Sequence, residues 1–144
     1  TISKIGLAAA RVGWARMHPD LAHEVDKARQ PFNLSTLAQA VGVLAFGELA
    51  PVLAEHVEAI VSERARLADA LASVDGLHPY PSDANFILCR YERDPDELAA
   101  ALLERDVAIK SFHAHGGRLA HHLRITVGTP AENDRLLEAL PSLA

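Results

Sequence analysis

The first 14 residues contain a lysine and an arginine, Lys4 and Arg11, within a run of small and apolar residues. Such neighbours would partly desolvate the Lys4 amine, and desolvation lowers the pKa of a lysine and favours the neutral amine that Schiff-base chemistry requires. Alanines and glycines around Arg11 would leave room for its guanidinium to hold a phosphate or carboxylate through two parallel hydrogen bonds. A solvated lysine at a chain end and a surface arginine in an ion pair are the alternatives.

A third cation, Arg124, lies in the segment 123–127, where apolar and polar residues alternate. In a strand this alternation puts Arg124 and Thr126 on one face and the apolar residues on the other. Next to the Gly128 turn, Arg124 could present its fork to a substrate carboxylate, or it could be an edge-strand charge that discourages aggregation. With Lys4 and Arg11 it would form a cationic site for a doubly anionic ligand.

Histidines gather in one ten-residue window, which contains four of the eight: His113, His115, His121 and His122. Structural zinc sites usually combine histidine with cysteine at fixed spacing, and the single cysteine, Cys89, lies in a different predicted strand. We therefore interpret the window as a polar loop and predict no metal site. A P-loop, a G-x-G-x-x-G motif and a Ser-His-Asp set are absent from the sequence.

The elements that must position these residues follow from the hydrophobic periodicity and from capping residues, such as the N-cap Ser35 and the capping box of Thr129 and Glu132. A tight loop leading into a short strand is expected within residues 1–17. The predicted helices are 18–29, 36–46, 49–74, 94–105 and 129–140, and the predicted strands are 85–91, 107–109 and 123–127. From residue 49 onward the order is helix, strand, helix, strand, strand, helix, which predicts an α+β or mixed α/β sandwich. Long loops are expected at 75–84 and 111–120.

The composition is that of an ordinary globular protein of 144 residues, 49% hydrophobic and 23% charged. It argues against a disordered chain, a disulfide scaffold and a membrane bundle, and the net charge of −5 argues against a nucleic-acid-binding protein. Polar residues interrupt the most apolar stretch, 37–54, so we expect a buried helix there and not a membrane span. No signal peptide is visible after Thr1.

Two segments resemble a known family at the expected distance from each other. Residues 1–14, TISKIGLAAARVGW, resemble the pyridoxal-phosphate lysine segment of fold-type I aminotransferases, and more narrowly that of the histidinol-phosphate aminotransferase family. Residues 123–134, LRITVGTPAEND, are similar to the C-terminal signature of that family, and 31–35 and 83–86 fit in order and spacing. The resemblance covers the whole chain. It implies the end of a large cofactor-binding domain at 1–46 and a small C-terminal domain at 47–144.

The resemblance implies a role for each residue of the lysine segment. Lys4 would form the Schiff base with pyridoxal 5'-phosphate and then act as general base and acid. Ser3 and Arg11 would bind the cofactor phosphate, with Thr1 as a weaker candidate. Arg11 follows Lys4 by seven residues, where many members of the family have eight, so the loop is one residue shorter here.

Substrate contacts are implied for two further cations. Arg124 would hold the α-carboxylate of glutamate or 2-oxoglutarate, and Lys110 falls where the family binds the substrate phosphate. The family often has arginine at the position of Lys110, and lysine keeps the charge but lacks the bidentate fork.

The resemblance thus implies part of a histidinol-phosphate transaminase of histidine biosynthesis, a cytoplasmic homodimer with small-molecule substrates and no nucleic-acid or membrane partner. We expect the segment alone to be inactive, because in this family the other cofactor-binding residues precede the lysine. Three alternatives stay open: a related class I/II pyridoxal-phosphate aminotransferase, a pyridoxal-phosphate decarboxylase of a phosphorylated amino acid, and a non-catalytic interaction module.

Overall fold

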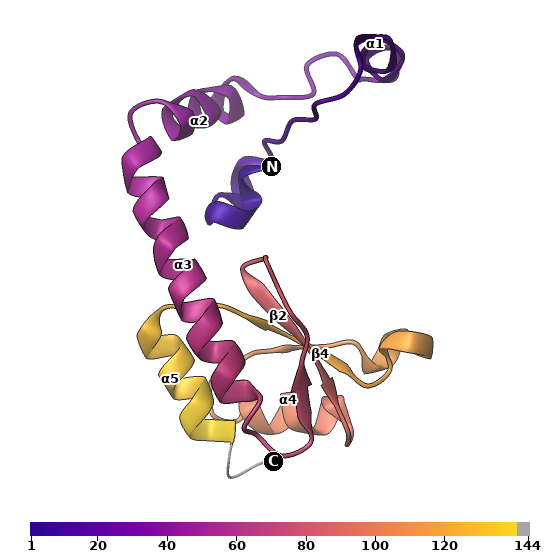
Figure 1. Ribbon diagram of the computed structural model, residues 1–144. Coiled ribbons are helices and arrows are strands. Elements are labelled where there is room, and N and C mark those ends of the chain that lie inside the picture. Colours follow the sequence, from indigo (N-terminus) through magenta and orange to yellow (C-terminus); the bar gives the residue numbers. More distant parts are fainter. Residues whose placement is uncertain (141–144) are drawn as a thin grey trace. The chain divides into compact units, whose positions relative to one another are not determined.

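The computed structural model describes residues 1–140 and divides into two compact units, Thr1–Val57 and Glu58–Ala144 (Figure 1). The long helix α3, Ala50–Leu71, belongs partly to each unit. Each unit is described by itself below.

Short helices make up the first unit. They are η1 (Ile2–Ile5), η2 (Ala8–Ala10), α1 (Pro19–Lys27), α2 (Thr36–Phe46) and the first turns of α3. The helix α2 begins at its N-cap Ser35, whose hydroxyl accepts a hydrogen bond from the backbone N–H of Ala38 at 3.1 Å. The buried residues of this unit are few, namely Ile2, Ala38 and Ala45. Trp14 contacts Phe46 edge-to-face, with the ring centroids 5.1 Å apart.

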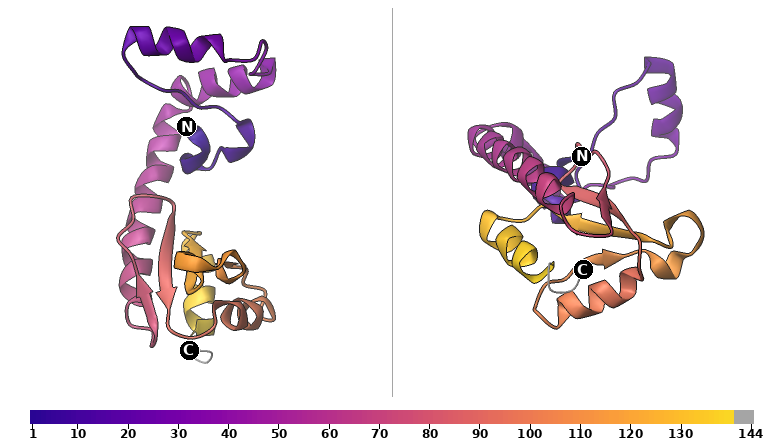
Figure 2. Two further views of the ribbon diagram at one scale, coloured as in Figure 1. Left: turned by 90° about the vertical axis from the view of Figure 1, so that its right-hand side faces the viewer. Right: turned by 60° about the horizontal axis from the view of Figure 1, so that its bottom comes forward.

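The second unit is built on a four-stranded antiparallel sheet in the order β1-β2-β4-β3. Its elements after α3 are β1 (Leu77–Pro79), β2 (Phe86–Tyr91), α4 (Pro95–Leu103), β3 (Lys110–Ser111), η3 (His113–His115), η4 (Gly117–Leu119), β4 (His122–Thr126) and α5 (Pro130–Ala139). The strands β2 and β4 form the centre of the sheet, with Leu88 opposite Arg124, and they lie side by side in both views of Figure 2.

One hydrophobic core holds this second unit together. Alternate strand residues, such as Ile87, Cys89, Leu123 and Ile125, point into it and are fully buried or nearly so. The helices α3, α4 and α5 all contribute leucines to the same core. Because side chains alternate across a strand, the intervening residues of β2 and β4 form the opposite face of the sheet, which we call the outer face.

Most predicted elements are confirmed, several of them closely. The structure has the predicted helix 36–46, the strand expected at 85–91 begins one residue later, and the helix expected at 129–140 is Pro130–Ala139. The predicted α+β character of the C-terminal part is also confirmed.

Four predictions about local structure are wrong. No strand forms within residues 1–17, because this stretch makes two 3-10 turns separated by Gly6 at φ 90°. The strand expected at 107–109 is instead Lys110–Ser111, because the N–H of Val107 bonds back to a carbonyl of α4. The two loops expected at 75–84 and 111–120 are only partly irregular, since they contain β1 and the turns η3 and η4 respectively.

No single helix within residues 1–140 is long and apolar enough to cross a membrane. Within the same residues, α2 and α3 reach that length and composition only when they are counted together as a bent pair.

Candidate functional site

The lysine segment forms a closed loop at the start of the first unit. Thr1 caps η1, because its hydroxyl oxygen accepts a hydrogen bond from the backbone N–H of Ser3 at 3.3 Å. The same hydroxyl donates to the carbonyl of Val12 at 3.1 Å, and the N–H of Ile2 bonds to that carbonyl at 3.2 Å. These bonds join residues about ten positions apart and set the hydroxyl oxygens of Thr1 and Ser3 3.0 Å from each other.

Arg11 lies at the far end of this loop, next to Val12 in the chain. It ends η2 in the left-handed backbone region, at φ 56°. A residue other than glycine pays of order 1 kcal/mol for this conformation, and such strain is often found at functional sites. The Arg11 guanidinium donates to the carbonyl of Ala8 at 3.5 Å and is otherwise exposed.

The side chain of Lys4 is exposed in this structure. The neighbouring small residues therefore do not bury this side chain, contrary to the expectation from the sequence. The loop does supply a group of hydroxyl, amine and guanidinium donors on one short segment, which suits a ligand with a phosphate and a carbonyl carbon. Of the four residues predicted here, Thr1 and Ser3 are in direct contact.

Arg124 and Lys110 are brought together on the outer face of the second unit. They lie directly opposite each other on the neighbouring strands β4 and β3, and both are exposed. The burial along β4 follows the predicted alternation, with Leu123 and Ile125 buried and Arg124 and Thr126 exposed. Two cations at such a pair of positions repel each other, which favours an anionic ligand between or beside them.

The turn that follows β4 is held by Asn133 and Glu63, which sequence reasoning did not identify, and by the predicted capping box of Thr129 and Glu132. The buried Asn133 accepts a hydrogen bond from the N–H of Gly128 at 3.0 Å and donates to its carbonyl at 3.1 Å and to Glu63 at 2.8 Å. Thr129 and Glu132 complete a capping box at the start of α5. A Cβ added at Gly128 would lie 2.8 Å from Oε2 of Glu132, and only the motif 123–134 marked this position in the sequence.

Electrostatics reinforces this turn. Hydrogen bonds from Arg66, followed by that from Asn133, lower the pKa of the Glu63 carboxyl. Arg66 also pairs with Asp134 at 2.8 Å, so the carboxylates on either side raise the pKa of its guanidinium. The bonds from backbone and hydroxyl of Thr129 lower the pKa of the Glu132 carboxyl. Together these contacts attach α3 to α5 and fix the chain where β4 ends.

The four clustered histidines make separate local contacts. His113 Nδ1 lies 2.9 Å from the carbonyl of Ala120, and the His113 ring meets His121 edge-to-face. His115 contacts the ring of Phe112, whereas the ring of His122 stacks on Tyr80. The predicted window therefore does not bring its histidines into one ligand set within residues 1–140.

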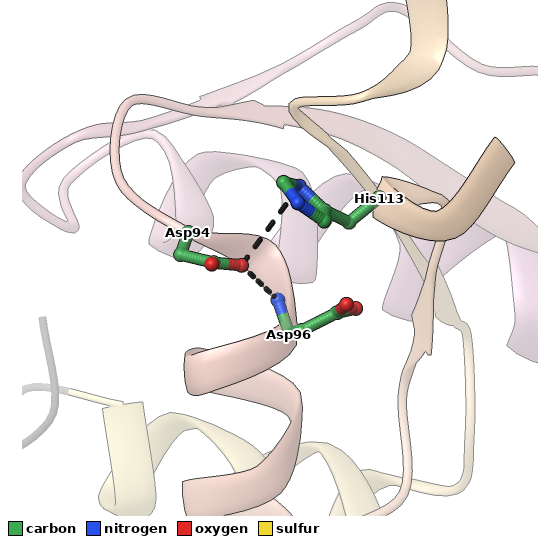
Figure 3. A group of neighbouring side chains, drawn as sticks. All are labelled: Asp94, Asp96 and His113. Atoms are coloured by element: carbon green, nitrogen blue, oxygen red, sulfur yellow. Dashed lines mark hydrogen bonds and ion pairs between the residues drawn. The ribbon is translucent and has the colours of Figure 1, made fainter. Parts of the chain in front are cut away.

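A different group of metal-ligating side chains does lie together, as Figure 3 shows for Asp94, Asp96 and His113. Their ligand atoms fall within 4.8 Å of one another. Asp94 is the N-cap of α4 and accepts a hydrogen bond from the N–H of Asp96 at 2.8 Å, while His113 Nδ1 is 3.9 Å from Asp94. This hydrogen bond explains the position of Asp94 as a helix cap.

A cavity of about 350 Å³ lies beside the turn that follows β4, between the segment 106–109 and α5. It is lined by Thr126, Asn133 and an ion pair between Arg135 and Asp106 at 3.0 Å. None of the predicted site residues lines this cavity.

The chain is similar to known proteins over nearly its whole length. The profile of the family described as aminotransferase class I and II matches residues 1–140. A histidinol-phosphate aminotransferase 2 of Bordetella parapertussis is 39% identical over 99% of this chain and 40% of its own length. A histidinol-phosphate aminotransferase of Roseiflexus castenholzii is 40% identical over 100% of this chain and 39% of its own length.

A solved structure has the same fold. The histidinol-phosphate aminotransferase of Sinorhizobium meliloti, determined in complex with pyridoxal-5'-phosphate, superposes with a TM-score of 0.75 at 30% identity. The match covers 99% of this chain and 39% of that one. The chain thus spans about 40% of the length of the curated relatives it matches.

Proposed function

Because the chain belongs to the aminotransferase class I and II family, we propose that it is the lysine-bearing and substrate-anchoring portion of a histidinol-phosphate transaminase. The reaction would exchange an amino group between glutamate or 2-oxoglutarate and histidinol phosphate or imidazole-acetol phosphate. The similarity to proteins named for this activity and the donor set of the lysine loop support the proposal.

The lysine loop would hold the cofactor, pyridoxal 5'-phosphate. When bound, this group supplies the electron sink that makes the α-carbon of the substrate acidic. Ser3 would donate a hydroxyl hydrogen bond to its phosphate, and Thr1 would do so once its hydroxyl leaves the carbonyl of Val12. Arg11 would add two charge-assisted bonds once its guanidinium leaves the carbonyl of Ala8. The amine of Lys4 would take a proton from the substrate α-carbon and return it as general base and acid.

The outer face of the second unit would hold the substrate. Arg124 would bind the α-carboxylate through its two-pronged guanidinium, which fits a carboxylate better than an ammonium does. Lys110 would bind the substrate phosphate as a single charge. The two cations, opposite each other on β3 and β4, would thus serve different substrates, because glutamate carries carboxylates and no phosphate, whereas histidinol phosphate carries a phosphate and no carboxylate.

The observation that carries the proposal is the loop in which Lys4 directly follows the hydroxyl pair of Thr1 and Ser3. Its test is reduction of the cofactor-loaded full-length enzyme with borohydride, followed by peptide mapping. Within these 144 residues the label can fall on three lysines, Lys4, Lys27 and Lys110, which peptide mapping distinguishes from one another. We expect the label on Lys4, and a Lys27→Ala variant should label as wild type does. Label on another lysine, or none, would contradict the proposal.

Arg124 provides a second test. Loss of charge-assisted hydrogen bonds worth about 1.5–3 kcal/mol should raise the KM for glutamate about 10- to 100-fold in Arg124→Ala. Arg124→Lys should recover only part of the loss, because it keeps the charge without the fork. Arg118→Ala removes an arginine from η4 and is the control. An unchanged KM for glutamate in Arg124→Ala would rule out the carboxylate role.

The remaining parts of the proposal concern the whole protein. We propose that residues 1–46 end the large domain, that 47–144 form the small domain, and that the enzyme is a cytoplasmic homodimer. A decarboxylase of a phosphorylated amino acid would release CO₂ from its substrate, whereas a transaminase would not. A non-catalytic module would leave Lys4 unlabelled in the borohydride experiment.

A further inference from the structure

The cavity beside α5 lies where the pairing of β3 with β4 stops. Its volume of about 350 Å³ falls within the range of small-molecule sites, roughly 300–1,000 Å³. The two strands pair as far as Lys110 and Arg124. Beyond this pair the segment 106–109 leaves the sheet and forms one wall of the cavity, while the end of β4 forms another.

The gap directs backbone groups of β4 at the cavity. The N–H of Val127 bonds to the carbonyl of Asn85 on the β2 side at 3.0 Å, and successive residues of a strand direct their backbone groups to alternate sides. The N–H and C=O of Thr126 therefore point to the side of β3, where the cavity takes the place of a pairing strand. A ligand with a hydrogen-bond donor and an acceptor can pair with them as a strand residue would.

Among residues 1–140, two carboxylates and one guanidinium line the cavity. Arg135 and Asp106 pair at 3.0 Å, and their side chains are 58% and 86% exposed, so this pair lies at the cavity mouth. An ion pair so exposed adds little stability, and a ligand can therefore replace either partner at small cost. The Glu132 carboxylate accepts both hydrogen bonds from Thr129 on Oε2, which leaves Oε1 for a ligand. These charges complement one carboxylate and one ammonium group.

The remaining side chains select the body of the ligand. Within the described part of the chain, the apolar side chains of the lining belong to the hydrophobic core or pack against it: Val107, Ile109, Ile125 and Leu136. Such walls favour an aliphatic side chain. The second carboxylate of glutamate would lie among apolar groups and near two protein carboxylates, both of which disfavour it.

We propose that this cavity binds a free α-amino acid with an aliphatic side chain. Arg135 binds the carboxylate of the amino acid, and Asp106 and Glu132 bind its ammonium group. The site is built from other residues than the lysine loop and the pair of Lys110 and Arg124. The inference therefore goes beyond the proposed function and does not depend on it.

The test is a titration of the 144-residue chain with L-leucine, followed in the amide NMR spectrum. The amides of Thr126 and Ala108 should shift and saturate, with a Kd of about 1 mM or less. Isocaproate lacks the ammonium group of leucine and isoamylamine lacks its carboxylate, so each should bind about tenfold or more weakly. L-Glutamate should shift these amides less than L-leucine does. No saturable shift at about 10 mM leucine, or equal affinity for leucine and isocaproate, would overturn the proposal.

Two variants test the charged groups. Arg135→Ala should weaken leucine binding about tenfold or more, because the carboxylate loses its charge-assisted hydrogen bonds. Glu132→Gln keeps a capping-box residue at this position and removes the charge that holds the ammonium group, so it should also weaken binding. Glu138→Gln removes a charge from an exposed position of the same helix and is the matched control. Unchanged leucine affinity in both Arg135→Ala and Glu132→Gln would refute the proposed contacts.

Arg124→Ala separates this cavity from the proposed substrate site. An amino acid held through its carboxylate by Arg124 would lose affinity in this variant, whereas an amino acid in the cavity should keep it. Loss of leucine binding in Arg124→Ala but not in Arg135→Ala would overturn the proposal, because leucine would then be bound at the outer face of the sheet.

Discussion

Replacing Asn133 by alanine is expected to lower the free energy of unfolding of the second unit by about 3 kcal/mol. The side chain is only 2% exposed and makes three hydrogen bonds, two to the backbone of Gly128 and one to the carboxylate of Glu63. Each bond to the neutral backbone contributes about 1 kcal/mol and the bond to the carboxylate more. Part of the free energy lost with the bond to the Glu63 carboxylate is regained, because Glu63 keeps its hydrogen bonds from Arg66.

Amide hydrogen exchange is the appropriate assay, because the single tryptophan, Trp14, belongs to the first unit and does not report on the second. The rate for core amides of β2 and β4 gives the free energy of opening of the second unit. The Gly128 amide should lose its protection entirely in Asn133→Ala. Asp134→Ala, on the same helix, removes only a partly exposed contact with Arg66 and should cost less than about 1 kcal/mol.

A variant of nearly the same shape sharpens the test. Asn133→Asp can still accept the N–H of Gly128, but it places a second carboxylate against Glu63 where an amide donated. The repulsion raises the pKa of the new carboxyl in the folded state, so the penalty should be complete at neutral pH and should diminish as the pH falls through that raised value. If Asn133→Ala and Asp134→Ala were equally stable, the reasoning that a buried hydrogen-bond network fixes this turn would be refuted.

Hydrogen bonds from Arg66 are the main cause of the lowered pKa of Glu63. The contribution of Glu63 to stability should therefore be complete above the ordinary carboxyl pKa and lost as the pH falls through the lowered pKa of the folded state. Glu63→Gln should abolish this part of the pH–stability profile, as measured by urea unfolding. Gly128→Ala should destabilise the protein by about 1–3 kcal/mol in thermal unfolding, because the added Cβ would lie 2.8 Å from Oε2 of Glu132, and an unchanged Tm would contradict this close approach. Burial raises the pKa of the Cys89 thiol to about 12. Iodoacetamide at pH 8 should therefore alkylate Cys89 far more slowly in the folded chain than in urea. Equal rates of alkylation would show that the thiol is accessible in the folded chain.

The sequence was sufficient for the elements whose signals are local. Ser35 predicted the start of α2, and the segment beginning at Thr129 predicted α5 with its capping box, because a cap is made between residues two or three positions apart. Alternation predicted which face of β4 carries Arg124, since neighbouring residues of a strand always point to opposite sides. The resemblance of 1–14 and 123–134 predicted the family.

Only the tertiary structure could decide features that depend on partners distant in the sequence. It showed Lys4 exposed, because the desolvation of a side chain depends on what packs around it and not on its neighbours in the chain. It moved β3 to Lys110–Ser111 through a bond between Val107 and the end of α4, and this register is what sets Lys110 opposite Arg124. It also placed Phe86 beneath Arg124, a pair 38 residues apart in sequence. The residue types that could do chemistry were thus readable from the sequence, whereas their distances and supports came from the pairing of strands and helices.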